Sequence, residues 1–195
     1  ERKGTRQGAR RASYRAWQFI SAGDFQKARY FGEVAIANDR SWPDGYRMLG
    51  LAYLRQGELE NARSAYERGV VAAPHNALLM SALADVYFEL AHYSLAEEQY
   101  RRAMHEDRDL AQKDPAFLNL GLSVYEQGRI EEAIELLEQG RRNAPHDSGL
   151  ALALGEIFMR QNRCQDAVRL FEEVVVAEPV NGRAEHDLAW GFIAL

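Results

Sequence analysis

The sequence has a single cysteine, Cys164, among its 195 residues. One cysteine cannot form a disulfide within the chain, and it excludes both a disulfide framework and a cysteine-rich metal site. No segment approaches the roughly 20 consecutive apolar residues that a membrane span requires, so this stretch is not expected to cross a bilayer. Two locations stay open: the cytoplasm, or the bacterial envelope with a membrane anchor outside this stretch.

Catalytic motifs are absent as well. The sequence contains no H-E-x-x-H, no nucleophile elbow, no glycine-rich phosphate loop and no Cys-x-x-Cys. The run "MHEDRD", residues 104–109, is interpreted as an acidic helix surface, because its carboxylates and histidine do not keep the spacing of metal ligands. A metal site is the alternative. Cys164 is expected to be a packed core thiol, with a reactive thiol as the alternative. We therefore expect neither an enzyme nor a cofactor.

Positive charge is concentrated at the start of a chain whose formal net charge is -5. Two interpretations stay open: a solvated and frayed start to the first helix, or a basic stretch that follows a membrane anchor upstream of Glu1 and touches anionic headgroups. Because the chain starts at Glu1 and not at Met, we expect it to be a piece of a longer protein. Nucleic acid is not an expected partner, since the basic residues do not continue as a stripe. The basic residues of this stretch are Arg2, Lys3, Arg6, Arg10, Arg11 and Arg15.

Small, aromatic and proline residues recur along the sequence with a period of 34. Alanines at positions 28, 62, 96, 133 and 167 are 34, 34, 37 and 34 residues apart. Gly50, Ala84, Gly121 and Gly155 follow the same steps, and Pro74, Pro145 and Pro179 keep the same register. A period of this length with such residues at fixed offsets predicts a helix-turn-helix solenoid.

Each offset has a physical reason within a pair of antiparallel helices, A and B. Small residues at the crossing, such as Gly50 with Ala62, are expected to let the two backbones approach closely. The same reason applies to Gly121 with Ala133 and to Gly155 with Ala167. Larger aromatics are expected to fill the gap between successive repeats: Tyr53, Tyr66, Phe158 and Phe171. Gly57 and Gly128 end their A helices because the turn favours a positive φ, and the prolines stop helix B.

These residues resemble the tetratricopeptide repeat family. The resemblance implies an all-α, right-handed superhelical solenoid with five repeats at 9–42, 43–76, 77–110, 114–147 and 148–181. A basic lead-in, 1–8, precedes them, and an unpaired A helix, 182–195, follows. Three extra residues, 111–113, precede the fourth repeat, so helix B of the third repeat is expected to be about a turn longer. That lengthening would alter the superhelical pitch.

The resemblance also implies a concave groove lined by the A helices, in which such solenoids hold their partners. It gives these groove residues: Tyr14, Trp17, Arg47, Met48, Leu51, Leu54, Asp85, Phe88, Leu118, Asn119, Leu122, Tyr125, Glu156, Met159 and Trp190. Packing between helices is the alternative role for Leu54, Phe88, Tyr125 and Met159. Leu51, Leu118 and Leu122 are interpreted as a binding strip, which suits an apolar-faced helix or an extended segment of a partner protein.

Three hypotheses on function follow. The first is a scaffold that binds another protein within a bacterial envelope assembly, such as pilus biogenesis or exopolysaccharide export. The second is a soluble regulatory adaptor for a short peptide, and the third, an enzyme, has no support in the motifs. A clamp for the acidic tail of chaperones is disfavoured, because Ser13, Trp17, Met48, Leu78 and Ala82 stand where it needs Lys, Asn and Arg.

The last A helix lacks a B partner in this sequence. Leu188, Phe192 and Trp190 are therefore expected to be short of a covering helix, whereas solenoids usually end in a polar cap. We expect the natural chain to continue, or another molecule to cover this surface, which would include a homo-oligomer formed through the uncovered C-terminal helix.

Overall fold

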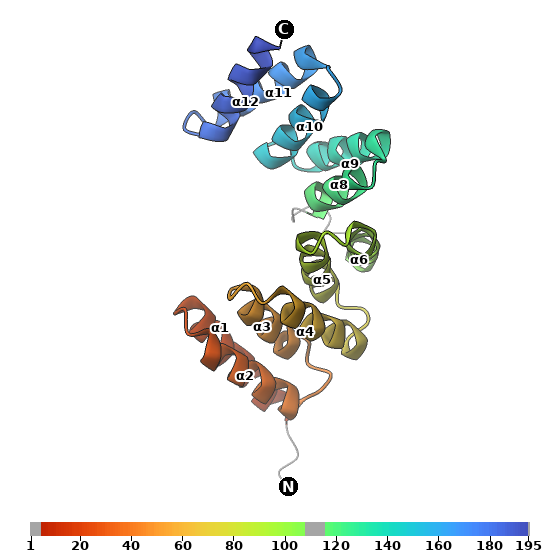
Figure 1. Cartoon of the computed structure of the whole chain (residues 1–195). Coiled ribbons are helices and arrows are strands. Elements are labelled where there is room, and N and C mark those ends of the chain that lie inside the picture. The colour runs from red at the N-terminus through yellow and green to blue at the C-terminus, as the bar shows by residue number, and fades with distance from the viewer. Residues whose placement is uncertain (1–4, 108–115, 195) are drawn as a thin grey trace. The chain divides into compact units, whose positions relative to one another are not determined.

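The protein, described here from a computed structural model that places residues 5–107 and 116–194, is built from helices. Those two ranges contain eleven α-helices and no strand, which confirms the predicted all-α repeat fold. The chain divides into two compact units, Glu1–Asp107 and Arg108–Leu195. The helices, labelled in Figure 1, are α1 (Arg6–Ser21), α2 (Phe25–Asn38), α3 (Pro43–Leu54), α4 (Leu59–Ala72), α5 (Ala77–Glu89), α6 (Tyr93–Glu106), α8 (Ala116–Glu126), α9 (Ile130–Asn143), α10 (Ser148–Arg160), α11 (Cys164–Ala177) and α12 (Gly182–Ile193).

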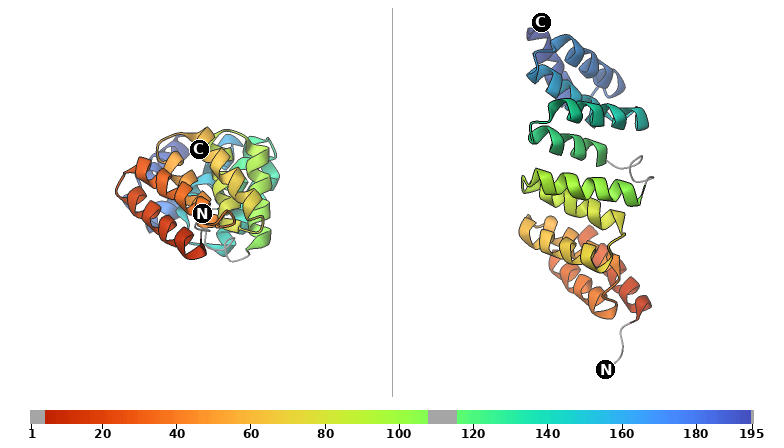
Figure 2. Two further views of the ribbon diagram at one scale, coloured as in Figure 1. Left: turned by 90° about the horizontal axis from the view of Figure 1, so that it is seen from below. Right: turned by 90° about the vertical axis from the view of Figure 1, so that its right-hand side faces the viewer.

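Each unit is a stack of antiparallel helix pairs. In the first unit, α1 pairs with α2, α3 with α4, and α5 with α6, and α3 also packs against α1 and α2. In the second unit, α8 pairs with α9 and α10 with α11, while α12 packs on α11 and touches α10. Figure 2 shows these pairs from two further directions. In both units the A helices of successive repeats are therefore neighbours, as a groove along them requires.

The five B helices have one length. Helices α2, α4, α6, α9 and α11 each contain 14 residues. The prediction of a longer α6 is wrong, because this helix ends at Glu106. The next residue, Asp107, is extended, with φ -136° and ψ 103°. Helix propensity is a weak preference that tertiary packing overrides, so the helix-forming run does not set where α6 ends. Residues 111–113 and their effect on pitch lie outside the described residues.

Side chains and prolines mark where the A helices begin. The Thr5 hydroxyl accepts a hydrogen bond from the Gly8 amide at 3.0 Å, and the Asn76 side chain accepts one from the Leu79 amide at 2.9 Å. Asp147 and Asn181 cap α10 and α12 in the same way. Such caps satisfy amide groups that have no partner inside the helix. Pro74, Pro145 and Pro179 fall between helix B and the next helix A, as predicted.

The turn between helix A and helix B has one left-handed residue in all five repeats. Gly57 and Gly128 have φ of 74° and 80°, which confirms the prediction for these two glycines. Ala91 and Asn162 occupy the equivalent place with φ of 57° and 60°. A left-handed conformation costs an L-residue with a Cβ about 1–2 kcal/mol, and asparagine tolerates it better than alanine.

Replacing Ala91 by glycine should therefore stabilise the protein. The substitution removes a strain of about 1–2 kcal/mol and adds an entropic cost of about 0.5–1 kcal/mol, so the expected net gain is roughly 0.5–1 kcal/mol. Urea denaturation of the variant measures this gain. Asn162→Gly is the matched control, and its gain should be smaller; a larger gain at Asn162 than at Ala91 would contradict the explanation.

The alanines of the 34-residue register are the centre of the core. Ala28, Ala62, Ala96, Ala133 and Ala167 are all completely buried on their B helices. A Cβ added to Gly121 would lie 3.5 Å from the Ala133 carbonyl oxygen, so helix A comes close to helix B at this alanine, as predicted.

Large side chains of helix B occupy the space above the glycines of helix A. A Cβ added to Gly50 would lie 2.6 Å from the Tyr66 ring, and one added to Gly121 would lie 2.6 Å from Leu137 Cγ. A Cβ at Gly155 would overlap the Phe171 ring. Tyr66 and Phe171 fill the space inside their own helix pair, and Phe171 also reaches the next repeat, as expected, because a Cβ on Gly191 of α12 would lie 3.9 Å from its ring.

Two buried tyrosines predict a loss of stability at high pH. Burial raises the pKa of Tyr66 above its usual range. Burial, and the hydrogen bond that the Tyr87 hydroxyl donates to Glu67 at 2.9 Å, raise the pKa of Tyr87 to about 12. In the unfolded chain, tyrosines have a pKa of ~10 and lose their protons above this pH, whereas the folded state keeps them. The free energy of unfolding therefore falls as the pH rises from ~10 toward 12. We expect the urea midpoint to fall in this window, and to fall less for the variant Tyr66→Phe with Tyr87→Phe; equal slopes would argue against this linkage.

Candidate partner-binding surface

The predicted groove residues differ widely in exposure. Tyr14, Trp17 and Trp190 are exposed, with 59%, 51% and 57% of their surface accessible. Met48 is 1% exposed and belongs to the core, so its assignment to the groove surface is wrong. It lies on the side of α3 that packs into the helix pair, a side that repeat spacing did not separate from the groove. The others are half-buried: Arg47, Leu51, Leu54, Asp85, Phe88, Leu118, Asn119, Leu122, Tyr125, Glu156 and Met159.

In the second unit, several of these side chains surround one cavity. It has a volume of about 510 Å³. Its lining comes from the A helices α10 and α12, with one aromatic ring from α11 below them. The lining residues are Glu156, Met159, Arg160, Phe171, Asp187 and Trp190. Glu156, Met159 and Trp190 are residues that the sequence assigned to the groove, and the structure brings them together.

The rim of this cavity carries charge of both signs. Arg183 of α12 forms an ion pair with Glu156 of α10, and its Nε lies 3.9 Å from Asp187 Oδ2. His186 Nδ1 lies 3.1 Å from Asp187 Oδ1. Exposed pairs of this kind contribute little to stability. Their carboxylates and the guanidinium can therefore exchange partners when a ligand arrives.

One guanidinium links the cavity to the preceding A helix of the same unit. Arg160 at the end of α10 lies over the ring of Tyr125 of α8, 5.7 Å from the ring centre, and its Nη1 is 3.5 Å from the Tyr125 hydroxyl. A cation over an aromatic face is stabilised by the ring's electron distribution. Tyr125, Arg160 and Trp190 thus form a continuous aromatic and cationic edge beside the apolar Met159.

The C-terminal helix also has an exposed apolar end. Phe192 and Ile193 are 54% and 77% exposed, as expected for a helix without a B partner in this sequence, whereas Leu188 is half-buried. Phe192 does not line the cavity. Its exposure on the same helix makes it a natural comparison for Trp190.

In the first unit, three predicted groove residues make contacts within the unit. The Tyr100 hydroxyl donates a hydrogen bond to Asp85 Oδ1 at 2.5 Å, and Arg47 Nε donates one to Asp44 at 3.1 Å. Phe88 meets Tyr93 edge to face, with ring centres 5.6 Å apart.

The two exposed aromatics of the predicted groove in the first unit lie together on α1. The rings of Tyr14 and Trp17 are stacked with centres 5.9 Å apart and an interplanar angle of 28°. They are the accessible part of the predicted groove in this unit. A stacked pair presents a broad apolar face with little side-chain freedom to lose on binding.

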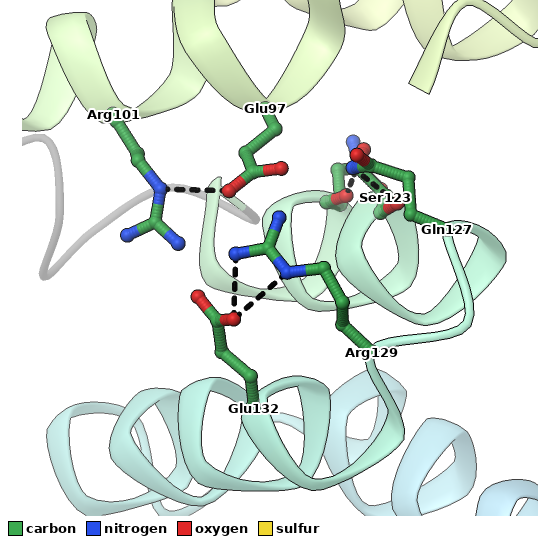
Figure 3. Close-up of polar contacts among 7 residues, drawn as sticks. Glu97, Arg101, Ser123, Gln127, Arg129 and Glu132 are labelled. Atoms are coloured by element: carbon green, nitrogen blue, oxygen red, sulfur yellow. Dashed lines mark hydrogen bonds and ion pairs between the residues drawn. The ribbon is translucent and has the colours of Figure 1, made fainter. Parts of the chain in front are cut away.

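Polar contacts along the helices hold side chains without creating a reactive group (Figure 3). On α6, Arg101 Nε donates to Glu97 at 3.0 Å. On α8, the buried Ser123 hydroxyl donates to the Asn119 carbonyl at 2.7 Å. At the start of α9, Arg129 Nε donates to Glu132 at 2.9 Å. These bonds within single helices are structural.

A second cavity involves one predicted groove residue, Tyr14, and otherwise residues that the sequence did not assign to the groove. It has a volume of about 690 Å³ and lies between α1 and α2, lined mainly by basic and amide side chains of α1. The α1 helix begins at Arg6, and its arginines are exposed, as the interpretation of a solvated start to the first helix expects. A signal for this surface was present, because Gln7, Arg11, Arg15 and Gln18 follow helical spacing along one face.

The remaining candidates of the sequence are Cys164 and the "MHEDRD" run. Cys164 is half-buried as the first residue of α11 and is not enclosed in the core as expected. No three His, Cys, Asp or Glu side chains of residues 5–107 and 116–194 gather as metal ligands. Part of "MHEDRD" lies outside these ranges. None of the helices described here is both long and apolar enough for a membrane span.

Antiparallel helix pairs at a 34-residue period, with a ligand-sized cavity on neighbouring A helices, define a helical repeat protein of the solenoid class. Sequence profiles of the tetratricopeptide repeat match residues 43–86, 81–148, 118–182 and 152–190. The chain therefore belongs to the tetratricopeptide repeat family. This family generally consists of protein-interaction scaffolds and not of enzymes.

Individual relatives come from different assemblies. The chain is 31% identical over 132 residues to the type IV pilus assembly protein PilF of Pseudomonas aeruginosa, which is 67% of this chain and 51% of PilF. It is 26% identical over 165 residues to anaphase-promoting complex subunit 3 of Schizosaccharomyces pombe, 84% of this chain and 24% of that protein. The chain thus spans about half and a quarter of these relatives. The solved structure of Pseudomonas aeruginosa pilF superposes with a TM-score of 0.80 at 16% identity, over 96% of this chain and 90% of that one.

Proposed function

We propose that this chain is a non-catalytic scaffold that holds an apolar-faced segment of a partner protein on its A helices, within a bacterial envelope assembly such as pilus biogenesis or exopolysaccharide export. The observation that carries the proposal is the cavity between α10 and α12, lined by Glu156, Met159 and Trp190. The pilus assembly protein PilF, as a relative of about one third identity, supports the envelope setting.

The composition of the cavity fits a protein segment. Met159, Phe171 and Trp190 offer an apolar floor, and Glu156 with Arg160 form a polar rim. Protein interfaces combine such an apolar centre with a polar edge, and methionine adapts its shape to different partners. One apolar side chain of the partner's helix or extended segment, together with the side chains next to it in that segment, would fill this space of about 510 Å³.

The test uses the exposed tryptophan. Trp190→Ala should leave stability almost unchanged, because the side chain is 57% exposed, and should weaken the partner at least tenfold, since tryptophans dominate interface energies and ~1.4 kcal/mol corresponds to that factor. The partner is identified by co-purification from the source organism, and affinities are then measured by titration calorimetry. Phe192→Ala, an exposed aromatic on the same helix outside the cavity, is the matched control.

Two outcomes would reject this site. One is unchanged affinity of Trp190→Ala, and the other is an equal loss for Phe192→Ala, which would move the interface to the end of α12. Leu51 and Leu122 discriminate less well, because both are half-buried and an aspartate there would also disturb packing. A regulatory adaptor for a short peptide remains the second hypothesis, and the identity of the captured partner separates the two.

A further inference from the structure

Helix α1 carries a concentration of unneutralised positive charge. Four arginines lie on it, Arg6, Arg10, Arg11 and Arg15, and the helix contains no Asp or Glu. Arg6 lies over the Trp42 ring, 5.4 Å from its centre. For the other three, no carboxylate of the described residues lies within 4.0 Å. In a chain with a net charge of -5, such a cluster is a local exception.

The carboxylates on and beside the neighbouring helix α2 have other partners. Asp24 is 2.7 Å from Lys27, and Glu33 is 3.6 Å from Arg68. Asp39 accepts a hydrogen bond from the Ser41 hydroxyl at 2.7 Å. Arg10, Arg11 and Arg15 are therefore available to a ligand from outside the unit.

These arginines border a cavity with an apolar wall. The space of about 690 Å³ is lined by Gln7, Arg10, Arg11, Tyr14, Arg15 and Gln18 of α1 and by Phe31 and Val34 of α2. The guanidinium of Arg15 lies 5.6 Å from the centre of the Phe31 ring, so charge and apolar surface meet within the cavity.

The polar side chains form one stripe along the helix. Gln7, Arg11, Tyr14, Arg15 and Gln18 are spaced i, i+4, i+7, i+8 and i+11, which places them on a single face. Eleven residues of helix rise by roughly 16 Å, a length that about five residues of extended chain cover. The amides of Gln7 and Gln18 stand at the two ends of this length, where they can bond to the backbone of such a chain.

We propose that this cavity, the α1 arginine cavity, is a second binding site, which takes an extended acidic peptide segment with alternating carboxylate and apolar side chains. In an extended chain, alternate side chains point to opposite sides. Carboxylates on one side would pair with Arg11 and Arg15, whose planar guanidinium suits bidentate contact with a carboxylate. The apolar side chains on the other side would cover Phe31 and Val34. The concave shape with an apolar wall favours this occupant over a flat membrane surface.

The experiment measures binding of a fluorescein-labelled peptide Glu-Leu-Glu-Leu-Glu-Leu-Glu by fluorescence anisotropy. The whole chain should bind it, and should bind the version with Gln in place of Glu at least tenfold more weakly. Arg11→Gln with Arg15→Gln should weaken the acidic peptide at least tenfold, and binding of the unaltered chain should weaken as salt is raised, because exposed charges are screened.

The matched control is Arg40→Gln with Arg55→Gln, two exposed arginines of the same unit outside the cavity. Its affinity should equal that of the unaltered chain, and both double variants should keep the melting temperature, since the arginines replaced are exposed. Loss of binding in the control variant would show attraction to overall charge and overturn the proposal. So would no binding of the peptide, or Arg11- and Arg15-dependent binding to phosphatidylglycerol vesicles without binding of the peptide.

Discussion

Phe171→Ala is expected to lower the free energy of unfolding by about 3–5 kcal/mol, the usual cost of removing a buried aromatic side chain. Phe171 is 1% exposed, and its ring fills the space over Gly155, where helix A has no side chain. The surrounding helices cannot close this gap without shifting their backbones, so a cavity remains. Urea denaturation followed by circular dichroism measures the loss.

The matched control for this substitution is Phe192→Ala, the same chemical change at an exposed position of the second unit. It should change the stability by less than about 0.5 kcal/mol, as surface substitutions usually do. Similar losses for the two variants would show that Phe171 does not fill the core of the α10 and α11 pair. Because Phe171 also lines the cavity proposed for the partner, its loss is expected to weaken binding as well.

Leucine in place of Ala62 or Ala133 should be the second large effect. Both alanines are completely buried on their B helices, one in each unit. Added methylene groups in a closely packed core force side chains off their preferred rotamers and cost about 1–3 kcal/mol, and sometimes more. The melting temperatures of both variants should therefore fall.

Exposed alanines in each unit provide the comparison. Ala37 lies on α2 and Ala189 on α12, and both side chains face solvent. Leucine is nearly as good a helix former as alanine, so Ala37→Leu and Ala189→Leu should leave the melting temperatures almost unchanged. If Ala62→Leu and Ala133→Leu melted like these controls, the interpretation of the 34-residue register as a packing register would be refuted.

The two proposed sites differ in how far the sequence could predict them. The second-unit cavity follows from the resemblance, since Glu156, Met159 and Trp190 occupy groove positions of A helices, and these are set by repeat spacing. The α1 arginine cavity was visible only as a basic run. Its meaning depends on Phe31 and Val34, which belong to α2 and meet the arginines only after the two helices pair.

The sequence by itself determined the fold, because each repeat encodes its own turn and buried face. The left-handed turn residues, the prolines and the alanines of helix B recur at positions that local geometry requires. Short-range patterns of this kind can be read along the chain, since residues close in sequence are also close in a helix pair.

Only the tertiary structure decided which side chains are accessible and which residues meet across helices. Met48 shares the repeat pattern of the groove but is buried, and Trp190 is exposed on α12. Tyr66 and Phe171 cover glycines that spacing had paired with alanines. The physical reason is that the repeat period fixes a residue's place in its helix, whereas its burial depends on the size of side chains that neighbouring helices bring to that place.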